Sequence, residues 1–266
     1  MYEKRFYRDL FKGSNLRFFN LCVFETDLSI GVSEKKSKEP YITNNNLDSI
    51  VQDNVSVEST VIYQTALKSV RKHRKEIEEY IKRHPEFLTS LEPIIPKPGG
   101  AAIVYKMCEA ARKAQVGPMA AVAGAISELV GYDLLEYCDE VIIENGGDIF
   151  IKTNSTRKIG IYAGKSPLNE KIALKISPWQ TPVGVCTSSG TVGHSLSFGK
   201  ADAAVIVSRD AFLADTVATA MGNKVKKPGD IENALKYASE IEGINGAIII
   251  IEDKIGAWGD IELTSF

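Results

Sequence analysis

The strongest constraint on the fold is the order in which strand-like and helical segments follow one another. Runs such as "EVIIENGGDIFI", "ADAAVIVS" and "GAIIII" have the length and β-branched content of strands. Helical patterns separate them only at irregular intervals, whereas a parallel α/β sheet needs a helix between successive strands. The sequence therefore predicts an α+β fold with mixed or antiparallel sheets and helices packed against them.

A segment rich in proline and glycine divides the chain. Before it, alternating apolar residues on both sides of residues 25–27 predict a strand pair, and residues 59–84 carry the apolar stripe of a long helix. Residues 92–100, "EPIIPKPGG", contain too many breakers for regular structure. We expect residues 1–92 to supply N-terminal strands and a long helix within the same fold. Residues 98–266 would form the core of the fold.

Two helices are predicted directly after this segment. The first runs from Ala101 to about Ala114, and the second begins near Pro118, a residue that suits a first helical turn. One surface of the second helix is almost bare of side chains, so we expect another element to pack very close to it. The residues of this bare surface are Ala120, Ala121, Gly124 and Ala125.

Composition limits the classes of partner. The chain of 266 residues is 44% apolar and 25% charged, with a net charge of -2, which is typical of a globular protein without a general attraction to nucleic acid. The basic run at residues 71–75 is followed at once by glutamates. We interpret it as a solvated helix face with i,i+4 ion pairs, not as a nucleic-acid site.

No apolar run approaches the roughly 20 residues that span a bilayer. The first residues also lack the apolar centre of a signal peptide. We therefore predict a cytoplasmic protein without a membrane partner. Its four cysteines are scattered without a CxxC pair and are expected to be reduced.

The segment "ENGGDIF" is the first candidate for a binding site. Asn145, Gly146, Gly147 and Asp148 could form a hairpin turn, because Asn-Gly tolerates positive φ angles. The same residues could form a ligand loop, since paired glycines let a ring or a phosphate approach the backbone. The residues alone leave both readings open.

The segment "AFLADTVATAMGN" predicts a short helix that ends at Gly222. Asp215 and Thr219 lie four residues apart, so their oxygens project from one face. One carboxylate and one hydroxyl suit Mg²⁺, which completes its octahedron with waters and substrate phosphates. The alternative is structural, with Thr219 bonded to its own helix and Asp215 to a backbone partner.

The stretch "CTSSGTVGHSLSFGK" is rich in hydroxyl groups and glycine. Its backbone N–H groups and hydroxyls at Thr187, Ser188, Ser189 and Gly190 could hold an anion. His194 could act there as an acid or base. The alternative is a polar surface loop with an ordinary histidine. Cys186 has no visible activating partner, so we expect a buried strand cysteine.

The order "ENGGDIF", then "TSSG" with a downstream histidine, then "ADTVATA" resembles the ApbE family of flavin transferases. The similarity covers roughly residues 98–223. It is specific as a set, although no single motif is. The run as a whole looks like a smaller ApbE-like branch found largely in archaea and anaerobic bacteria.

The resemblance implies a fold that holds FAD, with Mg²⁺ bridging the pyrophosphate. ApbE enzymes move FMN from FAD to a serine or threonine of a partner flavoprotein and release AMP. By position, Asp215 and Thr219 would bind the metal, residues 145–148 would line the flavin, residues 187–190 would face the nucleotide, and His194 would be the acid–base group.

The chain lacks two segments that ApbE enzymes usually carry, a "HIIDP" type segment after the "TSG" loop and a "KG" before the small-residue helix. FMN transfer, cleavage of FAD to FMN and AMP, and flavin binding without transfer all remain open. A different alternative is an accessory protein of anaerobic sulfide assimilation into homocysteine, a role linked to this branch, with Cys186 as its one candidate residue. Partners would then be an acceptor or a sulfur-metabolism protein, and a homodimer is also open.

Overall fold

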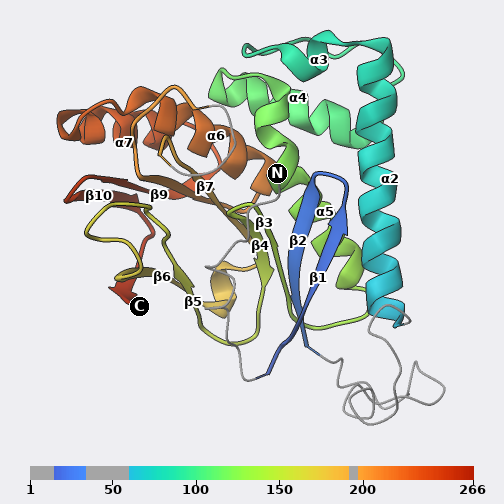
Figure 1. The fold of residues 1–266 in the computed structure, drawn as a ribbon, viewed down its shortest axis with the longest axis horizontal. Coiled ribbons are helices and arrows are strands. Elements are labelled where there is room, and N and C mark those ends of the chain that lie inside the picture. The colour runs from blue at the N-terminus through green and yellow to red at the C-terminus, as the bar shows by residue number, and fades with distance from the viewer. Residues whose placement is uncertain (1–14, 34–59, 192–196) are drawn as a thin grey trace.

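A computed structural model describes residues 15–33, 60–191 and 197–266 (Figure 1). The described residues form an eight-stranded sheet in the order β1-β2-β3-β4-β7-β8-β9-β10 and a three-stranded sheet in the order β11-β6-β5. Every neighbouring pair in both sheets is antiparallel. The predicted α+β class with antiparallel sheets is confirmed.

Short turns account for the antiparallel pairing, because a two-residue turn returns the chain directly to its neighbour. Such turns join β1 to β2, β3 to β4 and β9 to β10, which confirms the predicted strand pair around residues 25–27. The strands are β1 Arg17–Val23, β2 Thr26–Val32, β3 Val141–Asn145, β4 Asp148–Lys152, β5 Arg157–Gly160, β6 Ile172–Ile176, β7 Val183–Ser188, β8 Ala203–Ser208, β9 Ile244–Ile251, β10 Lys254–Gly259 and β11 Leu263–Ser265.

The helices gather on one side of the large sheet (Figure 1). One apolar cluster joins α2, α4 and α5 to β1–β4, and a second joins α6 and α7 to β7–β9. A third cluster fills the space between the opposite face of the large sheet and the small sheet. The helices are α2 Val61–Arg83, α3 Glu86–Thr89, α4 Ala102–Ala114, α5 Val122–Leu134, α6 Ala211–Lys224 and α7 Ile231–Ser239.

The helix expected to begin near Pro118 begins as a 3₁₀ turn, Pro118–Ala121, and continues as α5. Its bare surface packs against α6, as predicted. A methyl group at Gly124 would collide with the carbonyl oxygen of Ala211. The absence of a side chain therefore lets the two helix N-termini meet, and this contact matters for the site below.

The basic run at residues 71–75 lies on α2. Arg74 forms ion pairs with Glu25 at 2.7 Å and Glu78 at 2.9 Å. His73 differs from the expected solvated face, because it is buried and its Nδ1 lies 3.0 Å from Glu76. No helix among the described residues is long and apolar enough to cross a membrane.

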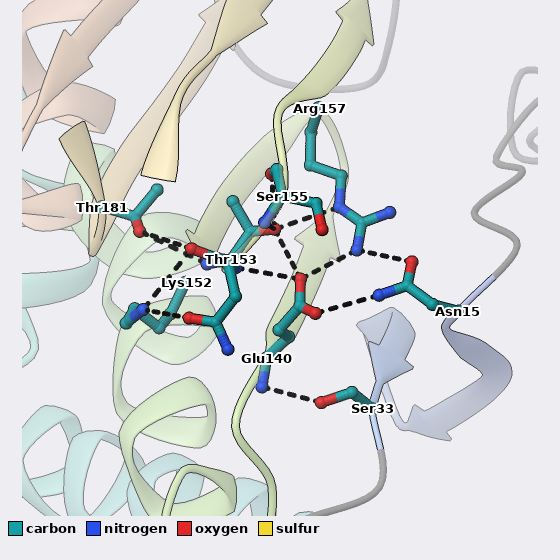
Figure 2. Close-up of polar contacts among 9 residues, drawn as sticks. Asn15, Ser33, Glu140, Lys152, Thr153, Ser155, Arg157 and Thr181 are labelled. Carbon is teal, nitrogen blue, oxygen red and sulfur yellow. Dashed lines mark hydrogen bonds and ion pairs between the residues drawn. The ribbon is translucent and has the colours of Figure 1, made fainter. Parts of the chain in front are cut away.

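A polar cluster around Glu140 ties the start of β3 to the end of β4 (Figure 2). One carboxylate oxygen of Glu140 accepts hydrogen bonds from Thr153 at 2.6 Å, from the backbone N–H of Asn154 at 3.0 Å and from Arg157 at 2.8 Å. The other oxygen accepts from Asn15 at 2.9 Å. These hydrogen bonds and the Arg157 charge outweigh burial and lower the pKa of Glu140.

Candidate functional site

The "ENGGDIF" segment forms the β3–β4 hairpin. Asn145 and Asp148 pair across a two-residue turn, in which Gly146 has φ 70° and Gly147 has φ 103°. The N–H of Gly147 donates to the Glu144 carboxylate at 2.8 Å. The hairpin turn, one of the two readings that the sequence left open, is therefore present, and both glycines adopt backbone angles that disfavour other residues.

Asp215 lies on the first half of α6 and points toward the N-terminus of α5. Its Oδ2 accepts the N–H of Gly124 at 2.8 Å, and the N–H of Ala123 also bonds to the carboxylate. Asp215 therefore has the backbone partners that the structural alternative predicts. The start of α6 is itself capped by Asp210, which accepts from the N–H of Leu213.

Asp148 and Asp215 come from different elements and lie close enough for their charges to interact. Both residues are 8% exposed. Burial raises the pKa of Asp148 well above its usual range, and the Asp215 charge raises it further, although the N–H of Thr187 favours the ionised form. Burial also raises the pKa of Asp215 to about 7, against the effect of the two α5 N–H groups. Within the described residues neither carboxylate forms an ion pair with lysine, arginine or histidine.

Thr219 lies one helical turn after Asp215 and is half-buried. Its neighbour Thr216 shows what a structural threonine does on this helix, since its hydroxyl donates to the carbonyls of Leu213 at 3.0 Å and Phe212 at 3.2 Å. The hydroxyl of Thr219 makes no such bond to any residue in the described ranges. It therefore remains a donor or acceptor for a ligand on the Asp215 side of α6.

The end of β7 meets both the glycine turn and α6. A methyl group at Gly147 would lie 3.7 Å from the Thr187 carbonyl oxygen, and one at Gly222 would lie 3.5 Å from Ser188 Oγ. The helix α6 continues to Lys224, so the expected stop at Gly222 is wrong. Gly199 packs against the carbonyl oxygen of Gly222, where a methyl group at Gly199 would collide with that oxygen.

Ser189 and Gly190 follow β7 and begin the loop that leads away from it. The hydroxyl of Ser189 lies 3.4 Å from that of Thr191, and the N–H of Gly190 donates to the Ala201 carbonyl at 2.8 Å. Thr191 in turn donates to Asp202 at 2.9 Å. The loop is thus anchored at its start, while His194 lies outside the described residues.

Strand alternation divides these residues between the two faces of the sheet. Cys186 packs in the cluster with α6, whereas Val185 packs toward the small sheet. Ser188 therefore shares the α6 face with Cys186, and Thr187 lies on the opposite face. Asp148 and Asp215 come together, and the N–H of Thr187 bonds to Asp148. Ser188 lies beside α6 at Gly222, and His194 lies outside the described residues.

Cys186 is a buried strand cysteine, as predicted. Its Sγ lies 3.6 Å from the Ala211 carbonyl oxygen, and its side chain is fully buried. Burial raises the pKa of the thiol well above its usual range, and the neighbouring Asp148 charge raises it further. A thiol in this state is a poor nucleophile.

Glu128 is a residue of this region that the sequence did not single out. One carboxylate oxygen accepts the N–H of Ala211 at 2.7 Å, and the other lies 3.2 Å from Lys106 Nζ. Burial raises the pKa of Glu128. It anchors the first turn of α6 to α5, and its only sequence signal is a carboxylate inside an otherwise apolar helical stripe.

The side chains around Asp215 do not form a complete set of metal ligands. In residues 15–33, 60–191 and 197–266 no group of three or more His, Cys, Asp or Glu is placed to hold a metal ion. Two surface hollows lie elsewhere, one beside Phe24 and Arg71 and one beside Lys165 and Glu252. A cation at Asp215 would therefore need oxygens from a second molecule.

The comparisons with known proteins agree with the motif order. The family model described as "AbpE bacteria" matches residues 8–262. The UPF0280 protein of Methanococcus aeolicus is 44% identical over 213 residues, which cover 78% of this chain and 86% of that protein. The UPF0280 protein of Methanothermobacter thermautotrophicus is 45% identical over 195 residues, which cover 71% of this chain and 75% of that protein.

Among solved structures, the ApbE protein of Thermotoga maritima matches with a TM-score of 0.50 at 14% identity, covering 91% of this chain and 96% of that one. The flavin transferase ApbE of Vibrio cholerae matches with a TM-score of 0.47 at 13% identity, covering 91% and 96%. The similarity to the Thermotoga maritima structure confirms the ApbE-like fold. Because the family model spans nearly the whole chain and the archaeal relatives cover more than two thirds of it, the chain belongs to the AbpE bacteria family, together with the UPF0280 proteins.

Proposed function

We propose that the protein binds a flavin nucleotide, FAD or FMN, together with Mg²⁺ at the junction of the β3–β4 turn, the end of β7 and α6. The observation that carries this proposal is the pair of buried carboxylates, Asp148 and Asp215. Burial raises the pKa of both carboxyl groups, the Asp215 charge raises that of Asp148 further, and no cationic side chain of the described residues compensates them. Buried charge of this kind is characteristic of functional sites.

The side chains at this position fit Mg²⁺. Asp215 and Thr219 offer a carboxylate and an uncommitted hydroxyl on one helix face, and Asp148 adds a second carboxylate nearby. These are hard oxygen donors, and Mg²⁺ commonly takes only one or two protein carboxylates. When bound, the ion would neutralise charge on a diphosphate.

The glycine turn and the residues after it suit the nucleotide. Gly146 and Gly147 present backbone without side chains beside Thr187. Within residues 187–190, the hydroxyls of Ser188 and Ser189 could donate to phosphate oxygens. Membership of the family, together with the resemblance of these motifs to ApbE flavin transferases, favours a flavin nucleotide over other diphosphates.

FMN transfer or FAD cleavage would extend this binding. An acceptor hydroxyl, or water, would form a new P–O bond at the FMN phosphorus while the bond to the AMP phosphate breaks, and the hydroxyl proton would pass to a base. His194 is the proposed base. The acceptor protein would supply the serine or threonine.

Two measurements test the proposal. Calorimetric titration of the purified chain with FAD, with and without Mg²⁺, is expected to show micromolar binding that Mg²⁺ strengthens and that Asp215→Asn weakens. Chromatography of the reaction mixture then separates binding from cleavage by the appearance of AMP. Failure to bind FAD or FMN with Mg²⁺ present would overturn the flavin assignment.

If the chain bound FAD but released no AMP, with or without an acceptor protein, transferase and cleavage activity would be excluded and a flavin-binding function would remain. The alternative role in sulfide assimilation remains a prediction. Its candidate residue, Cys186, is buried and has a raised pKa, which is unfavourable for sulfur exchange. Unchanged sulfide-limited growth of a host carrying Cys186→Ser would argue against a thiol role.

A further inference from the structure

The strand β10 is one of the two edges of the large sheet. It pairs only with β9, and α7 packs over part of one face. Five of its six residues are exposed, including Ile255 and Trp258, each 38% exposed. An edge strand of this kind offers unpaired backbone groups to another chain.

The hairpin geometry determines which backbone groups face outward. Ile251 and Lys254 flank the two-residue turn and form the closing pair of the β9–β10 ladder. In an antiparallel ladder, alternate residues direct their N–H and C=O groups away from the partner strand. The outward N–H and C=O groups are therefore those of Ile255, Ala257 and Gly259. No other described residue hydrogen-bonds to the outward groups of Ile255 and Ala257.

Protective features are weak along this edge. Natural edges usually carry central charges, proline or a bulge that prevents pairing with another chain. The interior of β10, from Ile255 to Gly259, reads "IGAWG" and has neither charge nor proline. Its only charges lie at the two ends, Lys254 and Asp260.

We propose that β10 pairs antiparallel with β10 of a second copy of this chain, with the two-fold axis at Ala257, to form a continuous sheet across a homodimer. In this register Ala257 lies opposite itself and exchanges both backbone hydrogen bonds. Lys254 lies opposite Asp260 of the second copy, so opposite charges close both ends of the pairing.

Side-chain sizes also match in this register. Gly256 lies opposite Trp258 of the second copy, and Ile255 lies opposite Gly259, so that each large side chain faces a glycine. A methyl group at Gly256 would collide with Ile231 of α7. The glycine is thus needed within one chain, and the indole of the second copy covers the space beside it.

The neighbouring register with the same outward groups is less complementary. With the axis at Gly256, Lys254 would face Trp258 and Asp253 would face Gly259 of the second copy. Lys254 and Asp253 would keep their own ion pair of 2.9 Å, but no opposite charges would meet across the interface. The distribution of charge and size therefore selects the axis at Ala257.

The first test is the mass in solution. Sedimentation velocity at micromolar concentration is expected to give twice the 29.1 kDa of one chain. Ala257→Lys places like charges across the axis and is expected to weaken the dimer by about tenfold or more. Asn245→Lys, an exposed residue of β9, is the matched control and is expected to keep the wild-type mass.

Exchanging the charges of the proposed Lys254–Asp260 pair tests the register of the dimer with more than one variant. Asp260→Lys is expected to weaken the dimer several-fold, because it repels Lys254 of the second copy, and the double variant with Lys254→Glu is expected to restore it. A double variant as weak as the single one would overturn the register. A monomer in the wild-type protein, or a dimer unaffected by Ala257→Lys, would overturn the interface.

Cross-linking gives a direct reading of the axis. In a background with the exposed Cys22 changed to serine, Ala257→Cys is expected to form a disulfide-linked dimer on mild oxidation, since residues directly opposite in a ladder lie roughly 5.5 Å apart. Ile255→Cys, which lies opposite Gly259, is expected to stay monomeric under denaturing electrophoresis. Cross-linking through Ile255→Cys and not through Ala257→Cys would contradict the proposal.

Discussion

The buried carboxylate of Glu140 and the buried pair Asp148 and Asp215 lie in two regions of the molecule that affect their charges in opposite ways. Glu140 accepts four hydrogen bonds, one of them from the Arg157 guanidinium, and its pKa is lowered. Asp148 and Asp215 receive backbone N–H groups and, at Asp148, the Cys186 thiol, but no cationic partner among the described residues; they lie near each other and have raised pKa values. The chain itself stabilises the negative charge of Glu140, whereas the negative charges of Asp148 and Asp215 would need a bound cation to compensate them.

This difference separates a structural polar cluster from a candidate functional one. A buried carboxylate with a matched cation contributes to the fold and needs no ligand. A buried pair without a cation costs folding free energy and persists where it serves another purpose. Predictions that perturb each region should therefore change different observables.

The largest effect is expected where the Asp215 region depends on backbone contact. Gly124→Ala places a methyl group against the Ala211 carbonyl and should lower the free energy of unfolding by about 3 kcal/mol or more. It should also displace the N–H that holds Asp215. Urea denaturation checks this, with Gly229→Ala as control, since nothing lies within 4 Å of a methyl group there. Equal stability of the two variants would contradict the close packing.

In the Glu140 cluster, Glu140→Gln should lower the free energy of unfolding by about 2–4 kcal/mol, because it leaves Arg157 buried without its counter-charge. The exposed Glu242→Gln is the matched control and should change little. Denaturation curves of both variants and the wild type measure this. If Glu140→Gln behaved like the control, the cluster would have no structural role.

Acid should remove the same contribution. The pKa of Glu140 is lowered in the folded state, so its stabilisation is present above the ordinary value of 4.5 and is lost as pH falls through the lower folded value. The stability difference between wild type and Glu140→Gln should therefore be constant near neutrality and shrink in acid. A difference that grew on acidification would have the wrong sign for this cluster.

The Asp148–Asp215 pair should respond in the opposite direction. Asp215→Asn keeps an acceptor for Gly124 and removes one of two mutually repelling charges. Without metal or nucleotide, the variant should be as stable as the wild type or more stable by about 1 kcal/mol. Thermal unfolding in the presence of a chelator measures this. A loss of several kcal/mol would show that Asp215 is structural in the same sense as Glu140.

Local patterns predicted much of the fold. The period-2 runs gave the hairpins, and the helical stripe of residues 59–84 became α2, because each pattern reflects burial of one face. Gly222 misled the prediction of a helix end, because α6 continues through it to Lys224 and its carbonyl oxygen is instead packed against Gly199. Such a contact joins residues distant in sequence and leaves no local signal.

For the candidate site, the sequence predicted which residues take part but not how they are arranged in space. The sequence pointed to Asp148 and Asp215 separately, but their mutual approach depends on how α6 crosses the ends of β4 and β7. Glu128 and the N–H of Gly124 had no motif, since their roles come from the meeting of two helix N-termini. Strand register, and not a motif, likewise places the Thr187 side chain on the face of the sheet opposite α6.

The most direct test of the cation site is a titration of thermal stability with MgCl₂ in the presence of FAD, for the wild type and for Asp215→Asn. A ligand that binds only the folded state stabilises it by RT ln(1 + [L]/Kd), so the melting temperature rises with ligand concentration. We predict that the melting temperature of the wild type rises with the Mg²⁺ concentration and that of Asp215→Asn does not. No rise in the wild type, or an equal rise in both proteins, would contradict the account.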